Sequence, residues 1–404
     1  MHEPLRVLHL TPDFPPVICG IADHAGWLTA QLAEQGLVVR VLTSPRSVHR
    51  ETEGVEVSAT VEHWDRRLWG AVGREVETFR PDVLHVHYQQ LMYEGDPAIG
   101  LLPWALSARR RRPAIVTTVH DMLPPTHAPR LAGRLALEAL VYGSDRLLVN
   151  GDREYRRLAK RPGLKSRSTL LPNGSNIQVQ PIGAEQKRSL RASVLSNQTA
   201  FLLTNFGLIR PGKGLEVLLD SMAELHARSI DVELLVIGGI PDADPVAGRA
   251  YWEALLEQRR RLGLEDSVHL LGHLPESRVS ELLQVGDLGV LPFDTGAFTG
   301  HTSVFAALSH GLPLLSTQGP ATEDVFMQGA MSLVPAPPQA GVLADAIEGL
   351  RRDPGLRKSL ASRGRELADR YSRQSLGARV AAIYSGAVGR AADPQQARIS
   401  AGRR

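Results

Sequence analysis

Short β-branched or leucine-rich runs alternate along the chain with amphipathic stretches of helical period. This alternation is typical of βαβ units, which build a mostly parallel sheet. It predicts helices at 21–35, 215–227, 249–261, 278–285 and 302–310. We expect strands at 6–10, 38–43, 83–87, 115–119 and 146–150 in the first half, and at 201–205, 232–237, 268–270, 288–291 and 313–316 in the second.

The rhythm occurs twice, and 404 residues are enough for two cores. A polar stretch with little periodicity places the join within 174–197. We expect an N-terminal Rossmann-like domain at 1–178, a C-terminal one at 195–370, a helix at 371–392 that packs back on the first domain, and a frayed tail at 393–404. Doubly wound sheets bind ligands beyond the carboxyl ends of their strands, so the fold class is α/β with an interdomain cleft.

Composition narrows the class of protein. Hydrophobic residues make up 43% and charged residues 22%, the balance of a soluble globular protein. The single cysteine, Cys19, excludes an intramolecular disulfide and a cysteine-based zinc cluster. Neither a signal peptide nor an apolar run of about 18 residues is visible, so we expect a cytoplasmic protein. Of 46 basic residues, 41 are arginine, which is compatible with an anionic substrate.

Three features of the first half are candidates for chemistry. Gly20 stands at a helix start after the first strand, where backbone amides favour an anion, although simple helix geometry also explains it. His120 ends a parallel strand, a position that faces the ligand edge of the sheet. Asp121 could orient its ring or cap the next segment. His85 and His87 share one strand face, but no third ligand has matching spacing, so we predict no metal.

Two loops of the second half could hold phosphate. The first contains Gly207, Arg210 and Lys213 between a strand and a helix, and a solvated basic turn is the alternative reading. It is not a Walker A loop, since the spacing fails. In the second loop, Thr302 and Ser303 would cap the next helix, whose free amides would equally hold a diphosphate. Capping does not explain three neighbours: Gly296, Gly300 and His301.

Eight segments in order resemble one family, the retaining family 4 glycosyltransferases of the GT-B fold. These segments are the opening loop with "HAGWLTAQLAEQG", then "PDVLHVHY", "TTVHD", "LLPNGSN", "FGLIRPGKGLEVLLDS", "LLVIGG", "VHLLGH" and "GVLPF…VFAALSHGLPLLST". The resemblance covers nearly the whole chain. It implies a transferase that moves a sugar from a nucleoside-diphosphate sugar to a glycan, lipid-linked or small-molecule acceptor with retention of anomeric configuration.

The resemblance also implies site residues. His120 would contact the donor sugar, and Lys213 would bind the diphosphate. The leaving diphosphate would be stabilised by Lys213, Arg210 and helix amides, with no metal, cofactor or dedicated carboxylate base. Donor-binding positions would be Gly20, Gly207, Gly238, His273, Gly300, His301, Thr302 and Ser303, with Gly238 and His273 at the nucleotide base.

Two departures from the family pattern bear on function. Leu208 stands where the family usually has an arginine, so Arg210 would substitute. The family's pair of glutamates falls on Phe298 and Ala306, neither of which accepts a hydrogen bond from its side chain. His301, with the two hydroxyl residues after it, resembles a branch with small and basic residues here. The lost pair affects donor selectivity, and it also permits an inactive protein.

Two alternatives therefore stay open: a nucleotide-sugar-binding or scaffold subunit without activity, and a GT-B sugar-nucleotide epimerase, which would need crevice carboxylates that this sequence does not concentrate. A nucleic-acid partner is not expected, since the run Arg109–Arg112 has no interleaved aromatic platform. Lipid-linked acceptors are frequent in the family. A basic N-terminal surface would accordingly favour peripheral contact with an anionic membrane, at the inner face of the plasma membrane.

Overall fold

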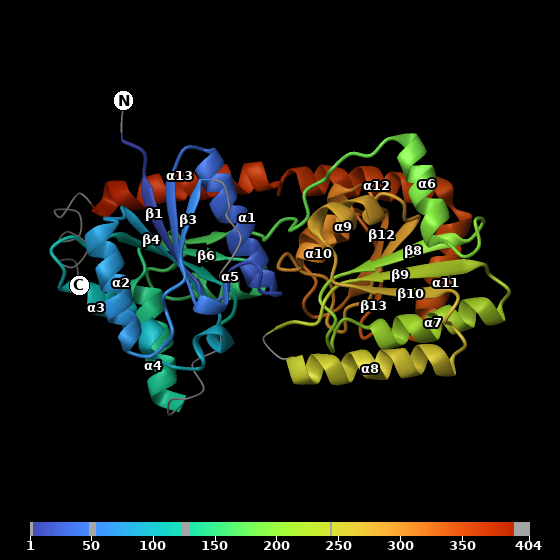
Figure 1. Cartoon of the computed structure of the whole chain (residues 1–404), viewed down its shortest axis with the longest axis horizontal. Helices are drawn as coiled ribbons and strands as arrows, with labels where there is room; N and C mark the ends of the chain where they lie inside the picture. Colours follow the sequence, from blue (N-terminus) through green and yellow to red (C-terminus); the bar gives the residue numbers. More distant parts are fainter. Residues whose placement is uncertain (1–2, 48–53, 123–129, 243–244, 392–404) are drawn as a thin grey trace. The chain divides into compact units, whose positions relative to one another are not determined.

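A computed structural model describes residues 3–47, 54–122, 130–242 and 245–391. It consists of two compact units (Figure 1). The first contains the chain up to Pro172 together with the C-terminal helix α13 (Arg373–Ala391), and the second contains Asn173–Ser372. The expected tail at 393–404 lies outside the described residues.

The first unit is built on a parallel seven-stranded sheet in the order β3-β2-β1-β4-β5-β6-β7. The five strands expected from the sequence are confirmed within a residue. The strand that the pattern missed, β3, is a short edge strand, whose polar residues hide the apolar signal. The bounds are β1 (Arg6–Leu10), β2 (Val38–Leu42), β3 (Val55–Ser58), β4 (Val83–Tyr88), β5 (Ala114–Val119), β6 (Arg146–Val149) and β7 (Ser168–Leu170).

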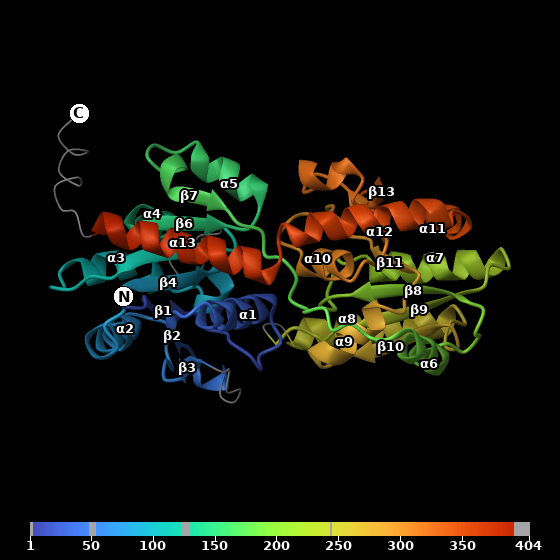
Figure 2. The ribbon, with the colours of Figure 1, turned by 90° about the horizontal axis from the view of Figure 1, so that it is seen from above.

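The two faces of this sheet differ in chemistry. On β4, Leu84, Val86 and Tyr88 join the hydrophobic core with α2 and α3. His85 and His87 alternate with them and therefore face the opposite side, where α13 packs against β4, β5 and α1 (Figure 2). The helices of the unit are α1 (Gly20–Glu34), α2 (Arg67–Thr78), α3 (Ala98–Ser107), α4 (Arg130–Gly143) and α5 (Asp152–Ala159), besides α13.

The second unit has a parallel six-stranded sheet in the order β10-β9-β8-β11-β12-β13. One core lies under α7, α8 and α11, and a second under α6, α9, α10 and α12. The strands are β8 (Phe201–Phe206), β9 (Val232–Ile237), β10 (Val268–Gly272), β11 (Leu288–Leu291), β12 (Leu314–Gln318) and β13 (Ser332–Pro335). The helices are α6 (Ala184–Val194), α7 (Leu215–Ala227), α8 (Pro245–Arg261), α9 (Glu276–Leu283), α10 (Thr302–Ser309), α11 (Ala340–Arg352) and α12 (Pro354–Asp369).

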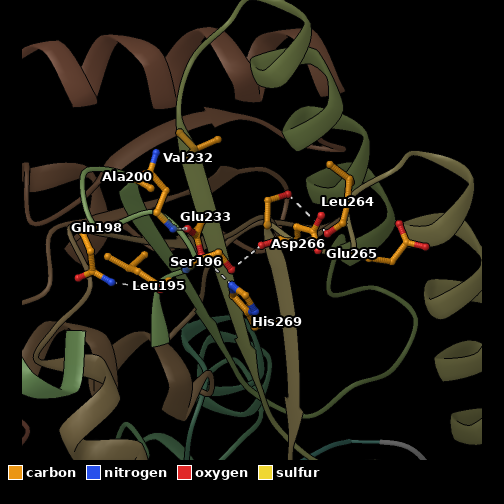
Figure 3. A network of polar contacts seen from close by, with 12 residues as sticks. Leu195, Ser196, Gln198, Ala200, Val232, Glu233, Leu264, Glu265, Asp266 and His269 are labelled. Carbon is orange, nitrogen blue, oxygen red and sulfur yellow. Dashed lines mark hydrogen bonds and ion pairs between the residues drawn. The ribbon is translucent and has the colours of Figure 1, made fainter. Parts of the chain in front are cut away.

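The stretch read as a join, 174–197, is integrated into the second unit and contains α6. Buried Glu233 on β9 accepts the backbone N–H groups of Ser196 and Asn197 at 3.0 and 2.6 Å, and its Oε2 lies 2.7 Å from His269 Nε2 on β10 (Figure 3). Arg191 on α6 pairs with Asp287 at 2.7 Å. These contacts are made by polar and charged side chains, so hydrophobic periodicity does not reveal them. Among the described residues, no helix has the length and hydropathy to cross a bilayer.

Candidate functional site

The carboxyl ends of β8 and β9 meet in closely packed glycines. Gly207 donates its N–H to Ile237 O at 3.0 Å, and a Cβ on Gly238 would overlap Gly207 O. Gly214 has φ +66° at the start of α7, and a Cβ there would overlap Pro292 O. There is therefore no room for a side chain at Gly238 or Gly214, and main-chain atoms pack directly against one another beneath the loop that contains Lys213.

Lys213 is a partly buried cation on this loop. Its Nζ lies 4.7 Å from the centroid of the Phe293 ring. Among the described residues, no carboxylate lies within ion-pair distance of it. Burial, and then the charge of exposed Arg210, lower the pKa of Lys213 to about 7. A buried charge without a counter-ion is costly, so the position favours an incoming anion.

The N-terminus of α10 adjoins the same loop. A Cβ on Gly207 would lie 3.6 Å from Ser303 Oγ, an ordinary contact distance. His301 is the N-cap residue and makes no side-chain cap bond, so Thr302 and Ser303 begin the helix with first-turn amides that have no intrahelical acceptor. Together with the helix dipole, these amides would stabilise an anion that is bound beside Lys213.

His301 is a neutral group within this half-site. Its ring lies against Phe293 and Phe298, with centroid separations of 3.8 and 4.2 Å. Burial, followed by the charges of Lys213 and Arg210, keeps the pKa of His301 well below its usual value. Its Nδ1 is buried, and within the described chain it has no hydrogen-bond partner. A buried ring nitrogen without a partner is uncommon, which makes His301 a candidate for contact with a ligand.

The loop that leads to His301 is held in place by hydrogen bonds. Asn173 donates its N–H to Thr299 O at 3.3 Å and its Nδ2–H to Gly300 O at 3.1 Å. A Cβ on Gly300 would overlap the ring of Phe298, so packing explains this glycine, which capping did not. Ala306 is completely buried in the core and presents no group to a ligand.

The residues predicted at the nucleotide base lie at neighbouring strand ends. Gly238 donates its N–H to Gly272 O at 2.9 Å, and Ile209 donates to Gly239 O at 2.9 Å. His273 follows β10 directly and is exposed. The structure thus brings Gly207, Gly238 and the β10 end together in one corner of the second unit.

In the first unit, His120 follows β5 at the carboxyl edge of the sheet. Its backbone N–H donates to Tyr88 O at 2.9 Å, its Nε2 lies 3.5 Å from His87 Nδ1, and its Nδ1 lies 3.4 Å from Asn150 Nδ2. Burial keeps its pKa well below the usual value, with His24 a second cause. Both ring nitrogens are therefore oriented by His87 and Asn150. Asp121, which the sequence suggested for this task, accepts from Gln90 N at 3.4 Å.

Gly20, in the first turn of α1, has no structural requirement for glycine. Apart from its chain neighbours and its own helix backbone, no heavy atom of the described residues lies within 4 Å of the position that its Cβ would take, and its φ is not in the left-handed region. One turn later, His24 is buried, its Nδ1 has no partner among the described residues, and burial lowers its pKa to about 4. This edge of the first unit therefore combines open space with an unsatisfied polar atom.

The sequence found no third ligand to join His85 and His87, but the structure brings His9 of β1 beside them. One ring nitrogen from each of the three lies within 4.8 Å of the others, and all three residues are buried.

Family models match both units in order: residues 18–179 match Glycosyltransferase Family 4, and residues 186–367 match Glycosyl transferases group 1. The chain is a GT-B glycosyltransferase. This glycosyltransferase is 26% identical over 266 residues to D-inositol 3-phosphate glycosyltransferase 2 of Catenulispora acidiphila, a match over 65% of this chain but only 60% of that protein. It is 25% identical over 333 residues to D-inositol 3-phosphate glycosyltransferase of Corynebacterium diphtheriae, covering 76% of this chain and 71% of the relative.

Solved structures share the GT-B fold. The Anabaena Alr3699/HepE structure in complex with UDP and glucose superposes with a TM-score of 0.73 at 18% identity, covering 95% of this chain and all of the other. WaaG, a glycosyltransferase involved in lipopolysaccharide biosynthesis, gives a TM-score of 0.66 at 17% identity over 94% of this chain and all of the other. The predicted fold class, two doubly wound Rossmann-like domains, is confirmed.

Proposed function

We propose that this glycosyltransferase transfers a sugar from a nucleoside-diphosphate sugar to an acceptor, with retention of anomeric configuration and without a metal. The observation that carries the proposal is Lys213, a partly buried cation with a lowered pKa and no carboxylate partner among the described residues. A diphosphate supplies the charge that this position lacks. The HepE structures, which share the fold, contain UDP or UDP-glucose.

In this proposal, the enzyme accelerates the reaction mainly by stabilising the leaving diphosphate. Negative charge grows on the diphosphate as its bond to the sugar breaks, and Lys213 is protonated as that charge approaches. Amides of Thr302 and Ser303 add fixed donors, and exposed Arg210 adds a second positive charge from the solvent side. Donors that are already in position need no reorganisation in the transition state.

We assign donor-contact roles in the first unit to Gly20 and His120. The open space at Gly20 accommodates a phosphate against the first amides of α1. His120 offers a neutral imidazole, so it hydrogen-bonds a sugar hydroxyl without adding charge. On the second unit, the unsatisfied Nδ1 of His301 serves as a further polar contact in place of the family's missing glutamate.

The test is nucleotide release from a panel of nucleoside-diphosphate sugars, with and without acceptor and chelator. We expect one donor to be turned over at a rate that the chelator does not change, and an anomeric product analysis to show retention. Lys213→Met should reduce turnover about a hundredfold, as expected for losing one charge-stabilising donor. Lys358→Met, the same substitution at an exposed lysine of α12, is the matched control. Equal rates for both variants would refute the role of Lys213.

The second candidate is a nucleotide-sugar-binding subunit without activity, favoured by Phe298 and by fully buried Ala306 at the glutamate positions. Calorimetry separates the two proposals. A donor that binds and is released intact with every acceptor supports the inactive subunit. Turnover with any acceptor excludes it.

For the acceptor we propose a polyol or sugar that is free or linked to lipid. The names of relatives specify D-inositol 3-phosphate and, for a Mycobacterium tuberculosis protein 24% identical over 324 residues, phosphatidyl-myo-inositol.

Helices α3 and α4 expose Trp104, Leu131 and Leu135, with Arg110 and Arg111 exposed just after α3. We propose that these residues contact an anionic bilayer. Co-sedimentation with anionic but not neutral vesicles, reduced in Leu135→Ser, tests it. Absence of binding at low ionic strength would refute it.

A further inference from the structure

A row of buried polar side chains crosses the α13-covered face of the first unit's sheet and ends at His120. We propose that Tyr384 of α13 is a positioning residue for His120, which it holds in a single tautomer through the intervening histidines. This inference rests on the role of His120 in the proposed function. We call the row His120, His87, His9, Tyr384 and His85 the histidine chain.

The first half of the histidine chain connects three strands. Asn150 Nδ2, directly after β6, lies 3.4 Å from His120 Nδ1. His120 Nε2 lies 3.5 Å from His87 Nδ1, and His87 Nε2 lies 3.1 Å from His9 Nδ1. The two inner rings are completely buried, and their planes are nearly stacked, with centroids 5.4 Å apart.

The second half runs through the C-terminal helix. Tyr384 Oη lies 3.4 Å from His9 Nε2 and 2.6 Å from His85 Nδ1. His85 Nε2 lies 2.7 Å from Thr118 Oγ1 on β5. Tyr384 is completely buried, so its hydroxyl forms hydrogen bonds with these two histidines and not with water.

The direction of donation is set by the groups at the two ends of the row. As the Asn150 amide is oriented, its NH₂ donates to His120 Nδ1, so the proton of His120 is on Nε2. His120 Nε2–H then donates to His87 Nδ1, and His87 Nε2–H donates to His9 Nδ1. His9 Nε2–H donates to Tyr384, leaving the tyrosine O–H for His85 Nδ1. Every ring is thereby assigned the same tautomer, with hydrogen on Nε2.

Burial supports this neutral arrangement. It lowers the pKa of His9 to about 3 and keeps those of His85 and His87 well below their usual value, so no ring is positively charged at neutral pH. A neutral imidazole has one donor and one acceptor, and each ring in the chain uses both. A metal at His9, His85 and His87 would have to displace bonds that already satisfy these nitrogens.

The consequence for catalysis is what His120 offers to a substrate. Its two bonds are long, at 3.5 and 3.4 Å, and a ligand hydroxyl can replace either one. With hydrogen on Nε2, the ring accepts at Nδ1 and donates at Nε2, whereas the opposite tautomer reverses these roles. Tyr384→Phe removes the acceptor for His9 Nε2–H and leaves His85 Nδ1 without its donor. A buried His9 Nε2–H without an acceptor is costly, so the reversed order, in which Asn150 turns its amide oxygen toward His120 Nδ1–H, becomes competitive and the single direction is lost.

The experiment combines ¹⁵N-histidine NMR with kinetics on the full-length protein. In wild type near neutral pH, we expect His9, His85, His87 and His120 all to carry hydrogen on Nε2, with signals assigned by single substitutions. In Tyr384→Phe we expect His120 to show mixed tautomers. We also expect a kcat at least about tenfold lower with little change in donor KM, the scale for losing a partner that orients a functional imidazole.

Val380→Ala is the control, because the Val380 side chain is completely buried on the same helix but has no group that can form a hydrogen bond. It should lower Tm while leaving the His120 tautomer and kcat unchanged. An Nδ1–H or positively charged His120 in wild type, an unchanged His120 spectrum in Tyr384→Phe, or one bound metal per chain would overturn the inference. Absence of turnover in wild type would overturn the proposed function instead, and the NMR measurement would still decide the role of Tyr384.

Discussion

Donor affinity should fall as pH rises through the pKa of Lys213. The free protein holds that pKa at about 7, through burial and the neighbouring charge of Arg210. The negative charge of a bound diphosphate opposes both effects and raises the pKa of Lys213. Binding is therefore coupled to proton uptake above pH 7, and affinity is greatest where the lysine is already protonated.

The magnitude follows from the protonated fraction. With a pKa of about 7, Lys213 is about nine-tenths protonated at pH 6 and about one-tenth at pH 8. Donor dissociation constants should therefore rise about tenfold over this interval, equivalent to about 1.4 kcal/mol. Titration calorimetry with an intact nucleoside-diphosphate sugar, in buffers of different ionisation enthalpy, measures both the constant and the proton uptake. Affinity that is flat from pH 6 to pH 8 would refute the reasoning.

Two variants separate this effect from general loss of structure. Lys213→Met should bind weakly at all pH values without the pH dependence, and Lys358→Met should retain it. The pH dependence of protein stability gives an independent test of the lowered Lys213 pKa. The folded pKa lies below that of an unfolded lysine, so the native protein incurs the cost of the buried charge fully below pH 7 and loses that cost as pH rises above it. Lys213→Met should accordingly raise Tm at pH 6, and a lowered Tm would indicate a structural role.

Three further outcomes follow from the glycines and the buried histidines. Gly20→Ala should raise donor KM several-fold, while the free energy of unfolding stays within about 1 kcal/mol of wild type. Gly349 is an exposed helical glycine with equally open surroundings, so Gly349→Ala should change stability alone. Equal donor KM values for the two variants would contradict a ligand role for Gly20. Gly238→Ala should greatly reduce the yield of folded protein, because its Cβ overlaps a carbonyl of the neighbouring strand end; a Tm within a few degrees of wild type would contradict this. Acidification from pH 7.5 to 5 should lower unfolding free energy by about 2 kcal/mol for each of His9 and His24, since unfolding lets these rings take up protons below pH 6.5; denaturant titrations that show no loss would refute it.

The fold was largely predictable because buried parallel strands are continuous apolar runs, which the sequence displays directly. β9 and β11 were placed at their observed bounds. Edge strand β13 was missed, since half-exposed residues do not form such a run. Helix α6 was missed for a different reason: Arg191 fixes it through a carboxylate and two carbonyls, which carry no periodic signal.

Prediction of the site was limited by contacts between distant residues. The strand-end rule selected His120 and the loop of Lys213, but it did not connect His120 with Asn150, which lies 30 residues later at the end of the adjacent strand. The alternation in β4 showed that His85 and His87 share a face. It could not show that Tyr384, 299 residues after His85, supplies the hydrogen bond to that ring.

The residues with the strongest claim to function are those that the fold itself does not require. Packing accounts for Gly238 and Gly300, whose Cβ atoms would overlap neighbours, so their identity is no argument for a ligand. Gly20 has open space, Lys213 lacks a counter-charge among the described residues, and His301 Nδ1 lacks a partner there. Each of these last three reduces stability or adds nothing to it. A glycosyl donor would satisfy the charge and the ring nitrogen, whereas substitution at a packing glycine would damage folding and activity together. Parallel measurement of Tm and turnover therefore distinguishes the two groups.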